Sequence, residues 1–211
     1  MNNVSPQDIA GFLAACHDAA GRGLMKCSSG NMSKRLDDER LIASASRSWM
    51  ERIREKEVSL CRICDGQLID GPKQTVEIAF HAEILRRRPE MNVVLHFQSP
   101  CATTLACSGD PDINYFVIPE IPFYMGQIGH VPYLAPGSPE LATAVTEVMT
   151  THDMAIMDHH GLVTAAKDYD HAIQNAVFFE LACEVIVRSQ RNATPLRESD
   201  AQVMIEAHES C

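Results

Sequence analysis

The sequence predicts an α/β domain in which helices and strands pack in layers. Short apolar runs typical of strands alternate with longer stretches whose apolar residues repeat at helical spacing, and this interleaving is typical of layered α/β domains. The strand-like runs lie at residues 41–42, 93–95, 115–118, 154–157 and 162–163. A hydrophobic fraction of 45% in 211 residues is enough for one domain, residues 1–211, with a sizeable core.

Three of the predicted helices share one start signal, a serine followed by a proline, found at Ser5-Pro6, Ser99-Pro100 and Ser138-Pro139. Serine can cap the free N–H groups of a first turn, and proline fits the first helical position without losing a needed donor. Apolar periodicity predicts two further helices, over residues 75–88 and 172–183. Four prolines in the segment 111–139 predict loops and edge strands there. From about residue 191 a polar C-terminal tail follows, with a short terminal helix.

The net charge of −10, from 18 basic and 28 acidic residues, disfavours nucleic acid and anionic membranes as partners, because both bind basic surfaces. It leaves a small anionic substrate open, since one phosphate needs only a few local donors. No apolar run approaches the roughly 18 residues of a membrane span. The first residues lack the basic and apolar regions of a secretory signal, so we expect a cytoplasmic protein whose eight cysteines are reduced.

Two histidines stand out by their position. His96 and His160 lie at or beside the ends of predicted strands, where side chains line the ligand crevice of open α/β sheets. Either one alone is more often a structural histidine than a metal ligand. Glu77 lies in the first turn of a predicted helix, where a carboxylate commonly assists capping and the helix dipole. The segment 27–31 is rich in hydroxyl and amide groups, which suits a phosphate cradle and an ordinary turn equally well.

Taken together, the order and spacing of these residues resemble the class II aldolase/adducin family, and in particular its aldolase branch. The matching stretches are Ser-Ser-Gly-Asn at 28–31, Glu77 followed by Phe80-His81, Val-Val-Leu-His at 93–96 and Asp-His-His-Gly at 158–161. The resemblance runs from the first helix to about residue 190. It implies a three-layer α/β/α sandwich around a mixed, largely antiparallel sheet. It also implies a homotetramer with active sites at subunit interfaces.

The same resemblance implies a divalent metal, usually zinc, held by three histidines. By position these ligands fall on His96, Gln98 and His160, so glutamine replaces the second histidine of the family's His-x-His pair. Because an amide oxygen is a harder and weaker donor than imidazole, this change lowers zinc affinity or favours manganese or magnesium. Glu77 matches a further metal ligand of the substrate-free enzymes and the acid/base of the reaction.

The implied activity is that of a lyase cleaving a short ketose phosphate through an enediolate, with Glu77 moving the proton. Such a role favours a carboxylate whose pKa is raised in a partly dry site. The family's phosphate-binding positions fall on Ser28, Gly30, Asn31, Ser46 and Thr75. Ser46 stands where the family has glycine, and a tyrosine position of the aldolases is Ile118 here.

Two other functions remain open. One is a dehydratase or decarboxylase of a sugar-derived phosphate on the same scaffold. The other is a degenerate member that assembles without catalysis, as the adducin head domain does. Retention of Glu77, His96 and His160 favours an enzyme. The non-catalytic alternative stays open because of Gln98, of Val76 in place of the family's serine, and of the missing tyrosines.

Overall fold

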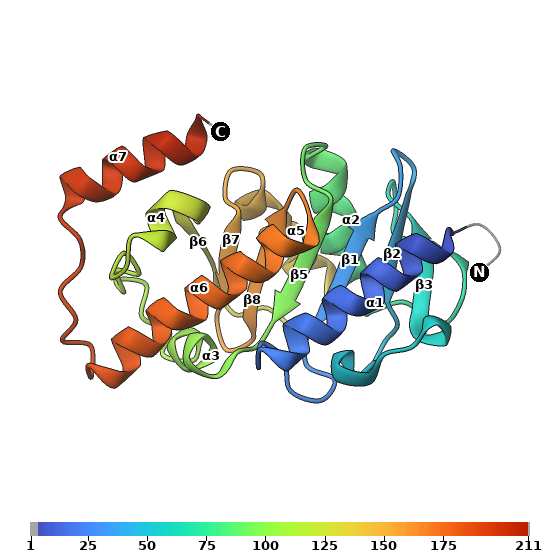
Figure 1. The fold of residues 1–211 in the computed structure, drawn as a ribbon, viewed down its shortest axis with the longest axis horizontal. Helices are drawn as coiled ribbons and strands as arrows, with labels where there is room; N and C mark the ends of the chain where they lie inside the picture. The colour runs from blue at the N-terminus through green and yellow to red at the C-terminus, as the bar shows by residue number, and fades with distance from the viewer. Residues whose placement is uncertain (1–3, 211) are drawn as a thin grey trace.

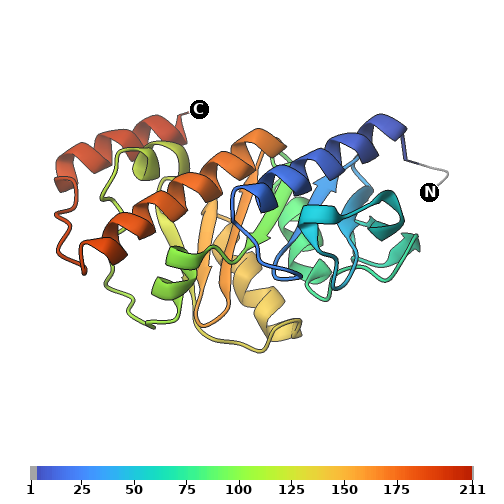
Figure 2. The same ribbon diagram turned by 60° about the horizontal axis from the view of Figure 1, so that its bottom comes forward.

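Within residues 4–210, which the computed structural model describes, eight strands form one sheet with helices on both faces (Figures 1 and 2). In spatial order the strands are β4 (Leu68–Asp70), β3 (Val58–Arg62), β2 (Arg40–Ser44), β1 (Asn31–Arg35), β5 (Val93–Phe97), β8 (Gly161–Ala166), β7 (Met154–Met157) and β6 (Ile128–Val131). Neighbouring strands run antiparallel except β6 and β7, which are parallel. The predicted mixed, largely antiparallel sheet is confirmed.

Two hydrophobic cores, one on each side of the sheet, hold the layers together. Val93, Leu95 and Phe97 of β5 point into the first core, and Val94 points into the second, as the alternation of a strand requires. The first core packs against α1 (Pro6–Gly21), α3 (Pro100–Ala106), α4 (Glu120–Met125) and α6 (Tyr169–Arg188). The second packs against α2 (Ile78–Arg87) and α5 (Pro139–Met149). The three-layer sandwich is therefore confirmed.

The helices predicted from Ser-Pro pairs all form. The Ser5 hydroxyl accepts a hydrogen bond from the Asp8 backbone at 3.0 Å, and the Ser138 hydroxyl accepts one from Leu141 at 3.1 Å. Helix α7 (Glu198–Glu209) is the short helix expected in the polar tail, and it packs against α4 (Figure 1). Two single-turn 3-10 helices, η1 (Met50–Arg52) and η2 (Glu55–Glu57), precede β3.

The strand predicted at residues 115–118 is wrong, since this apolar segment is a turn that leads into α4. Two of its backbone N–H groups bond locally. The Phe116 N–H donates to the Asn114 side chain at 2.9 Å, and the Val117 N–H donates to the Tyr115 carbonyl at 2.8 Å. These local bonds replace the ladder that a strand would need.

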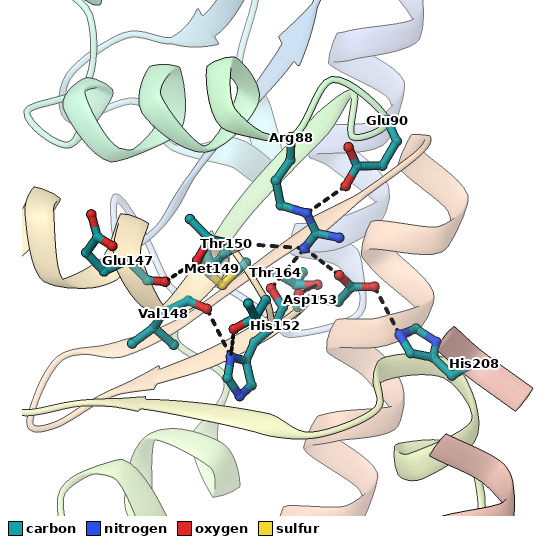
Figure 3. Close-up of polar contacts among 11 residues, drawn as sticks. Arg88, Glu90, Glu147, Val148, Met149, Thr150, His152, Asp153, Thr164 and His208 are labelled. Carbon is teal, nitrogen blue, oxygen red and sulfur yellow. Dashed lines mark hydrogen bonds and ion pairs between the residues drawn. The ribbon is translucent and has the colours of Figure 1, made fainter. Parts of the chain in front are cut away.

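The end of α2 is fixed by a buried arginine (Figure 3). Arg88 Nη1 donates to the His152 carbonyl at 3.1 Å and to Asp153 Oδ1 at 2.6 Å, just before β7 begins. The second Asp153 oxygen lies 3.3 Å from His208 Nε2 in α7. Both Arg88 and Asp153 side chains are only 15% exposed, so this contact joins α2, β7 and α7 out of reach of most solvent screening.

Among residues 4–210, no helix combines the length and the apolar character that crossing a membrane requires.

Asp153→Asn should lower the free energy of unfolding by roughly 1.5–3 kcal/mol at pH 7, because the Arg88 charge loses its charge-assisted bond. Burial raises the pKa of the Asp153 carboxyl, but the His208 and Arg88 contacts outweigh burial and hold it below 3.8. A carboxyl whose pKa is lowered by folding stabilises the folded protein at pH values above its pKa in the unfolded chain. This stabilisation is lost as the pH falls through its pKa in the folded protein. In urea titrations, the free energy of unfolding of the variant should therefore differ more from that of the wild type at pH 7 than at pH 3.

The matched control is Glu147→Gln, which removes an ion pair with Arg87 from a side chain that is 59% exposed. It should cost less than about 1 kcal/mol. Equal losses of unfolding free energy in the two variants would contradict a larger contribution from the shielded Arg88–Asp153 contact.

Candidate metal centre

Three of the predicted site residues come together between the sheet and the start of α2. Glu77 lies at the N-cap position of α2, His96 lies in β5, and His160 lies in the turn between β7 and β8. Glu77 Oε2 is 3.5 Å from His96 Nε2, and Glu77 Oε1 is 3.1 Å from His160 Nε2. One donor atom from each residue lies within 4.8 Å of the others. This spacing allows a single cation to contact all three.

Strand register places His96 in the centre of this site. Its Cα pairs with Asn31 of β1 on one side and with Val163 of β8 on the other. Alternation turns the side chain to the face covered by α2, so that it meets Glu77. The residue is 1% exposed.

A tight turn presents His160. His159 has φ of 55° and Gly161 has φ of 155°, and the His160 N–H closes the turn on the Met157 carbonyl at 3.1 Å. A Cβ atom on Gly161 would lie 2.7 Å from the Phe97 carbonyl oxygen and 3.2 Å from His96 Cε1. Glycine is needed here because any side chain would push against the segment that carries His96.

Glu77 is a buried carboxylate that stays ionised. Burial raises its pKa, but the neighbouring His96 and His160 imidazoles and the Asn31 amide outweigh burial and hold the pKa well below the usual range. The raised pKa expected from the sequence is therefore wrong. Within the described chain Glu77 makes no side-chain cap bond to α2, so ordinary helix capping does not explain it.

The donor atoms suit a divalent cation. His96 Nδ1 must donate to the Leu162 carbonyl, at 2.8 Å, because a carbonyl only accepts. Burial lowers the pKa of His96, and its Nε2 atom faces the Glu77 carboxylate at 3.5 Å. A divalent cation between this nitrogen and the carboxylate would bond to both of them. Among residues 4–210, Glu77 Oε1 and His160 Nδ1 are also buried without a hydrogen-bond partner. Imidazole nitrogens and a carboxylate are usual donors to zinc, and the His96 ring is fixed through its second N–H as zinc-binding rings typically are.

Gln98, the third predicted ligand, lies beside this cluster. Its amide nitrogen donates to the backbone carbonyl of His160 at 2.7 Å and so connects the end of β5 to the turn that carries His160. This contact assigns the amide orientation, since an amide oxygen would repel the carbonyl. Its role as a metal ligand stays a prediction.

The predicted phosphate-binding residues lie on three neighbouring loops. Register between β1 and β2 brings the loop that ends at Asn31 next to the loop that follows Ser44. The Thr75 N–H donates to the Ser44 carbonyl at 3.2 Å, and the Ser46 N–H donates to the Lys73 carbonyl at 2.9 Å. Gly30 has φ of 92°, and a Cβ there would lie 2.6 Å from the His96 carbonyl oxygen. Ser28 is exposed and Ser46 half-buried, whereas Asn31 and Thr75 are buried.

Two buried polar residues without a predicted role adjoin the site. His81 follows Glu77 by one helical turn, and Ser33 follows Asn31 by two residues on β1. Both are fully buried, and they bond to each other at 2.8 Å. The spacing from Glu77 to His81 was the available signal, because residues four apart share a helix face.

The fold and this cluster define a class II aldolase-type enzyme scaffold. The sequence model of the family described as Class II Aldolase and Adducin N-terminal domain matches residues 10–187, and the chain belongs to this family. It is 30% identical over 157 residues to a 3-oxo-tetronate 4-phosphate decarboxylase of Haemophilus influenzae, covering 73% of this chain and 74% of that protein.

The chain is also similar to an L-fuculose phosphate aldolase of Methanococcus vannielii, at 30% identity over 176 residues, 83% of this chain and 93% of that protein. Among solved structures, an L-fuculose 1-phosphate aldolase superposes with a TM-score of 0.85, at 18% identity and 98% coverage of both chains. The identity in that last comparison supports the fold alone.

Gly161→Ala should weaken zinc binding by about 10-fold or more, because the added methyl displaces the segment that holds His96. Gly109→Ala is the matched control, since Gly109 also has a positive φ, of 61°, but its Cβ would meet nothing within 4 Å. Calorimetric titration of both variants with zinc separates the effect of strain at a positive φ from the effect of displacing the segment that carries His96. Equal affinities would contradict the predicted crowding.

Proposed function

We propose that this protein is a metal-dependent lyase that cleaves a carbon–carbon bond next to the carbonyl of a short ketose phosphate. The observation that carries the proposal is the buried cluster of Glu77, His96 and His160. His96 and His160 would hold the cation, with Glu77 and Gln98 as further ligands. When bound, a divalent cation supplies Lewis acidity, which stabilises negative charge on the carbonyl and adjacent hydroxyl oxygens of the substrate.

Glu77 performs the proton transfer in this proposal. Bond cleavage leaves an enediolate, and the carbon that loses its partner must receive a proton. The carboxylate is ionised, and its Oε1 atom lies 3.1 Å from His160 Nε2. In this proposal it accepts the proton of the hydroxyl that becomes the aldehyde carbonyl and returns a proton to that carbon. His96 and His160 each lie within 3.5 Å of one carboxylate oxygen, so the proton acceptor lies beside the proposed cation.

The substrate phosphate would bind to the three loops that carry Ser28, Gly30, Asn31, Ser46 and Thr75. Their hydroxyl, amide and backbone N–H groups are donors, and the positive φ of Gly30 supports a close approach of the backbone. Arg47, exposed at φ of 65°, adds a cation beside Ser46.

Decarboxylation of a phosphorylated sugar acid is the second candidate, favoured by the similarity to the Haemophilus influenzae decarboxylase. Both reactions produce an enediolate, but aldol cleavage releases an aldehyde whereas decarboxylation releases carbon dioxide. Zinc-loaded and manganese-loaded protein should be assayed for both products with ketose phosphates and 3-oxo acid phosphates. Absence of turnover with every substrate of both classes would favour the non-catalytic alternative.

We further propose a cytoplasmic homotetramer with active sites between subunits. The reducing compartment is supported by the cysteines among the described residues, which are all free: Cys16, Cys27, Cys61, Cys64, Cys101, Cys107 and Cys183. Sedimentation of the purified protein measures the assembly.

Glu77→Gln should reduce turnover by roughly 10²–10⁴-fold, because it keeps the shape of the side chain but removes the proton-transfer group. Glu83→Gln on the same helix is the control, since Glu83 pairs with Arg86 and Arg87 near the surface. Steady-state kinetics and melting curves of both variants provide the test. Normal turnover in the Glu77 variant would limit Glu77 to a structural role.

Gln98→His should tighten zinc binding by roughly tenfold or more, about 1.4 kcal/mol, because imidazole suits zinc better than a neutral amide oxygen does. Gln98→Leu controls for loss of the bond to the His160 carbonyl. Zinc and manganese titrations of all three proteins give the answer. If the histidine variant binds zinc no better than wild type, position 98 is not a ligand position.

A further inference from the structure

A chain of hydrogen bonds runs behind Glu77, away from the two histidines that face its carboxylate. Asn31 Nδ2 donates to Glu77 Oε2 at 2.7 Å, Asn31 Oδ1 lies 2.5 Å from His81 Nε2, and His81 Nδ1 lies 2.8 Å from Ser33 Oγ. Each of the four residues is at most 8% exposed. The chain is therefore closed to bulk water.

Matched spacing on two elements produces this chain. Glu77, the N-cap residue of α2, and His81 lie four residues apart, about 6 Å along the helix axis. Asn31 and Ser33 lie two residues apart on β1, about 6.6 Å, and share one face of the sheet. The polar side chains of the helix and the strand therefore have similar spacing, and Asn31 bonds to both Glu77 and His81.

The charge on Glu77 sets the direction of every bond in the chain. A carboxylate only accepts, so the Asn31 amide must turn its N–H toward Glu77 and its oxygen toward His81. His81 must then carry its proton on Nε2, and its Nδ1 must accept from the Ser33 hydroxyl. Burial lowers the pKa of His81 to about 3, so the ring is neutral and has one proton to place.

We propose that His81 and Ser33 are positioning residues of the metal centre. They lock the Asn31 amide so that it holds Glu77 Oε2, which leaves Oε1 directed toward His160 and the cation. This inference rests on the proposed metal site and adds a supporting shell to it. A ligand-orienting partner of this kind typically contributes 10–100-fold to metal affinity.

The test compares His81→Leu, which removes the donor to Asn31, with His81→Gln, which keeps an N–H at a similar reach. His81→Leu should weaken zinc binding about 10–100-fold and shift the visible absorption of the cobalt-substituted protein, and His81→Gln should restore much of both. His17→Leu is the control, because His17 also makes a hydrogen bond to a residue far along the chain, the backbone carbonyl of Ile53. It should change the melting temperature without changing the cobalt spectrum.

Ser33→Ala tests the same chain if His81→Leu fails to fold, and it should weaken zinc binding by a smaller factor. Wild-type zinc affinity and an unchanged cobalt spectrum in a folded His81→Leu or Ser33→Ala variant would overturn the inference. If the wild-type protein takes up no divalent ion, the proposed function fails, and ¹⁵N NMR of His81 separately tests whether the hydrogen-bond chain positions the Glu77 carboxylate. A proton on Nε2 with a slowly exchanging Asn31 amide supports it, and a proton on Nδ1 overturns it.

Discussion

An ionised carboxylate in a protein interior is costly unless nearby charge and hydrogen bonds compensate it, and Glu77 is the residue in which this cost is concentrated. It is 5% exposed, yet its pKa stays below the usual range. Asn31 donates to one oxygen, and His96 and His160 face the carboxylate from the sheet side. A divalent cation between the carboxylate and the two imidazoles would complete this compensation and give the site its proposed chemistry.

The architecture holds Glu77 by fixing both ends of a short helix. At the start of α2 the side chains of Asn31 and His96 come from paired positions on β1 and β5. At its end Arg88 binds Asp153 and the backbone before β7. Because β7 leads directly into the turn that carries His160, the same anchor relates α2 to that ligand. Helix position, strand register and turn geometry therefore converge on one carboxylate.

Much of this arrangement was predictable from sequence where the determinants are local. Ser5 and Ser138 cap the helices that their Ser-Pro pairs predicted, and His96 and His160 lie at the strand ends expected of site residues. The low pKa of Glu77 was not predictable, because the groups that lower it come from β1, β5 and the β7–β8 turn. Residues 115–118 were wrongly predicted as a strand because apolar β-branched and aromatic residues also suit a partly buried turn, which here includes the local bond from Phe116 to Asn114.

The role of His81 illustrates the same limit. Its spacing from Glu77 shows that both share a helix face, but only the register of β1 against β5 reveals that Asn31 and Ser33 face them. Resemblance to a family supplied the linked set of ligands, whereas the direction of the bonds among them follows from the three-dimensional contacts.

The most direct test of the central claim is anomalous scattering at the zinc absorption edge from crystals grown with zinc. One peak is expected within about 2.0–2.2 Å of His96 Nε2, His160 Nε2 and a Glu77 carboxylate oxygen. A peak at surface histidines or cysteines only, with Glu77 still bonded as in the zinc-free protein, would contradict the claim that this buried carboxylate belongs to a metal centre.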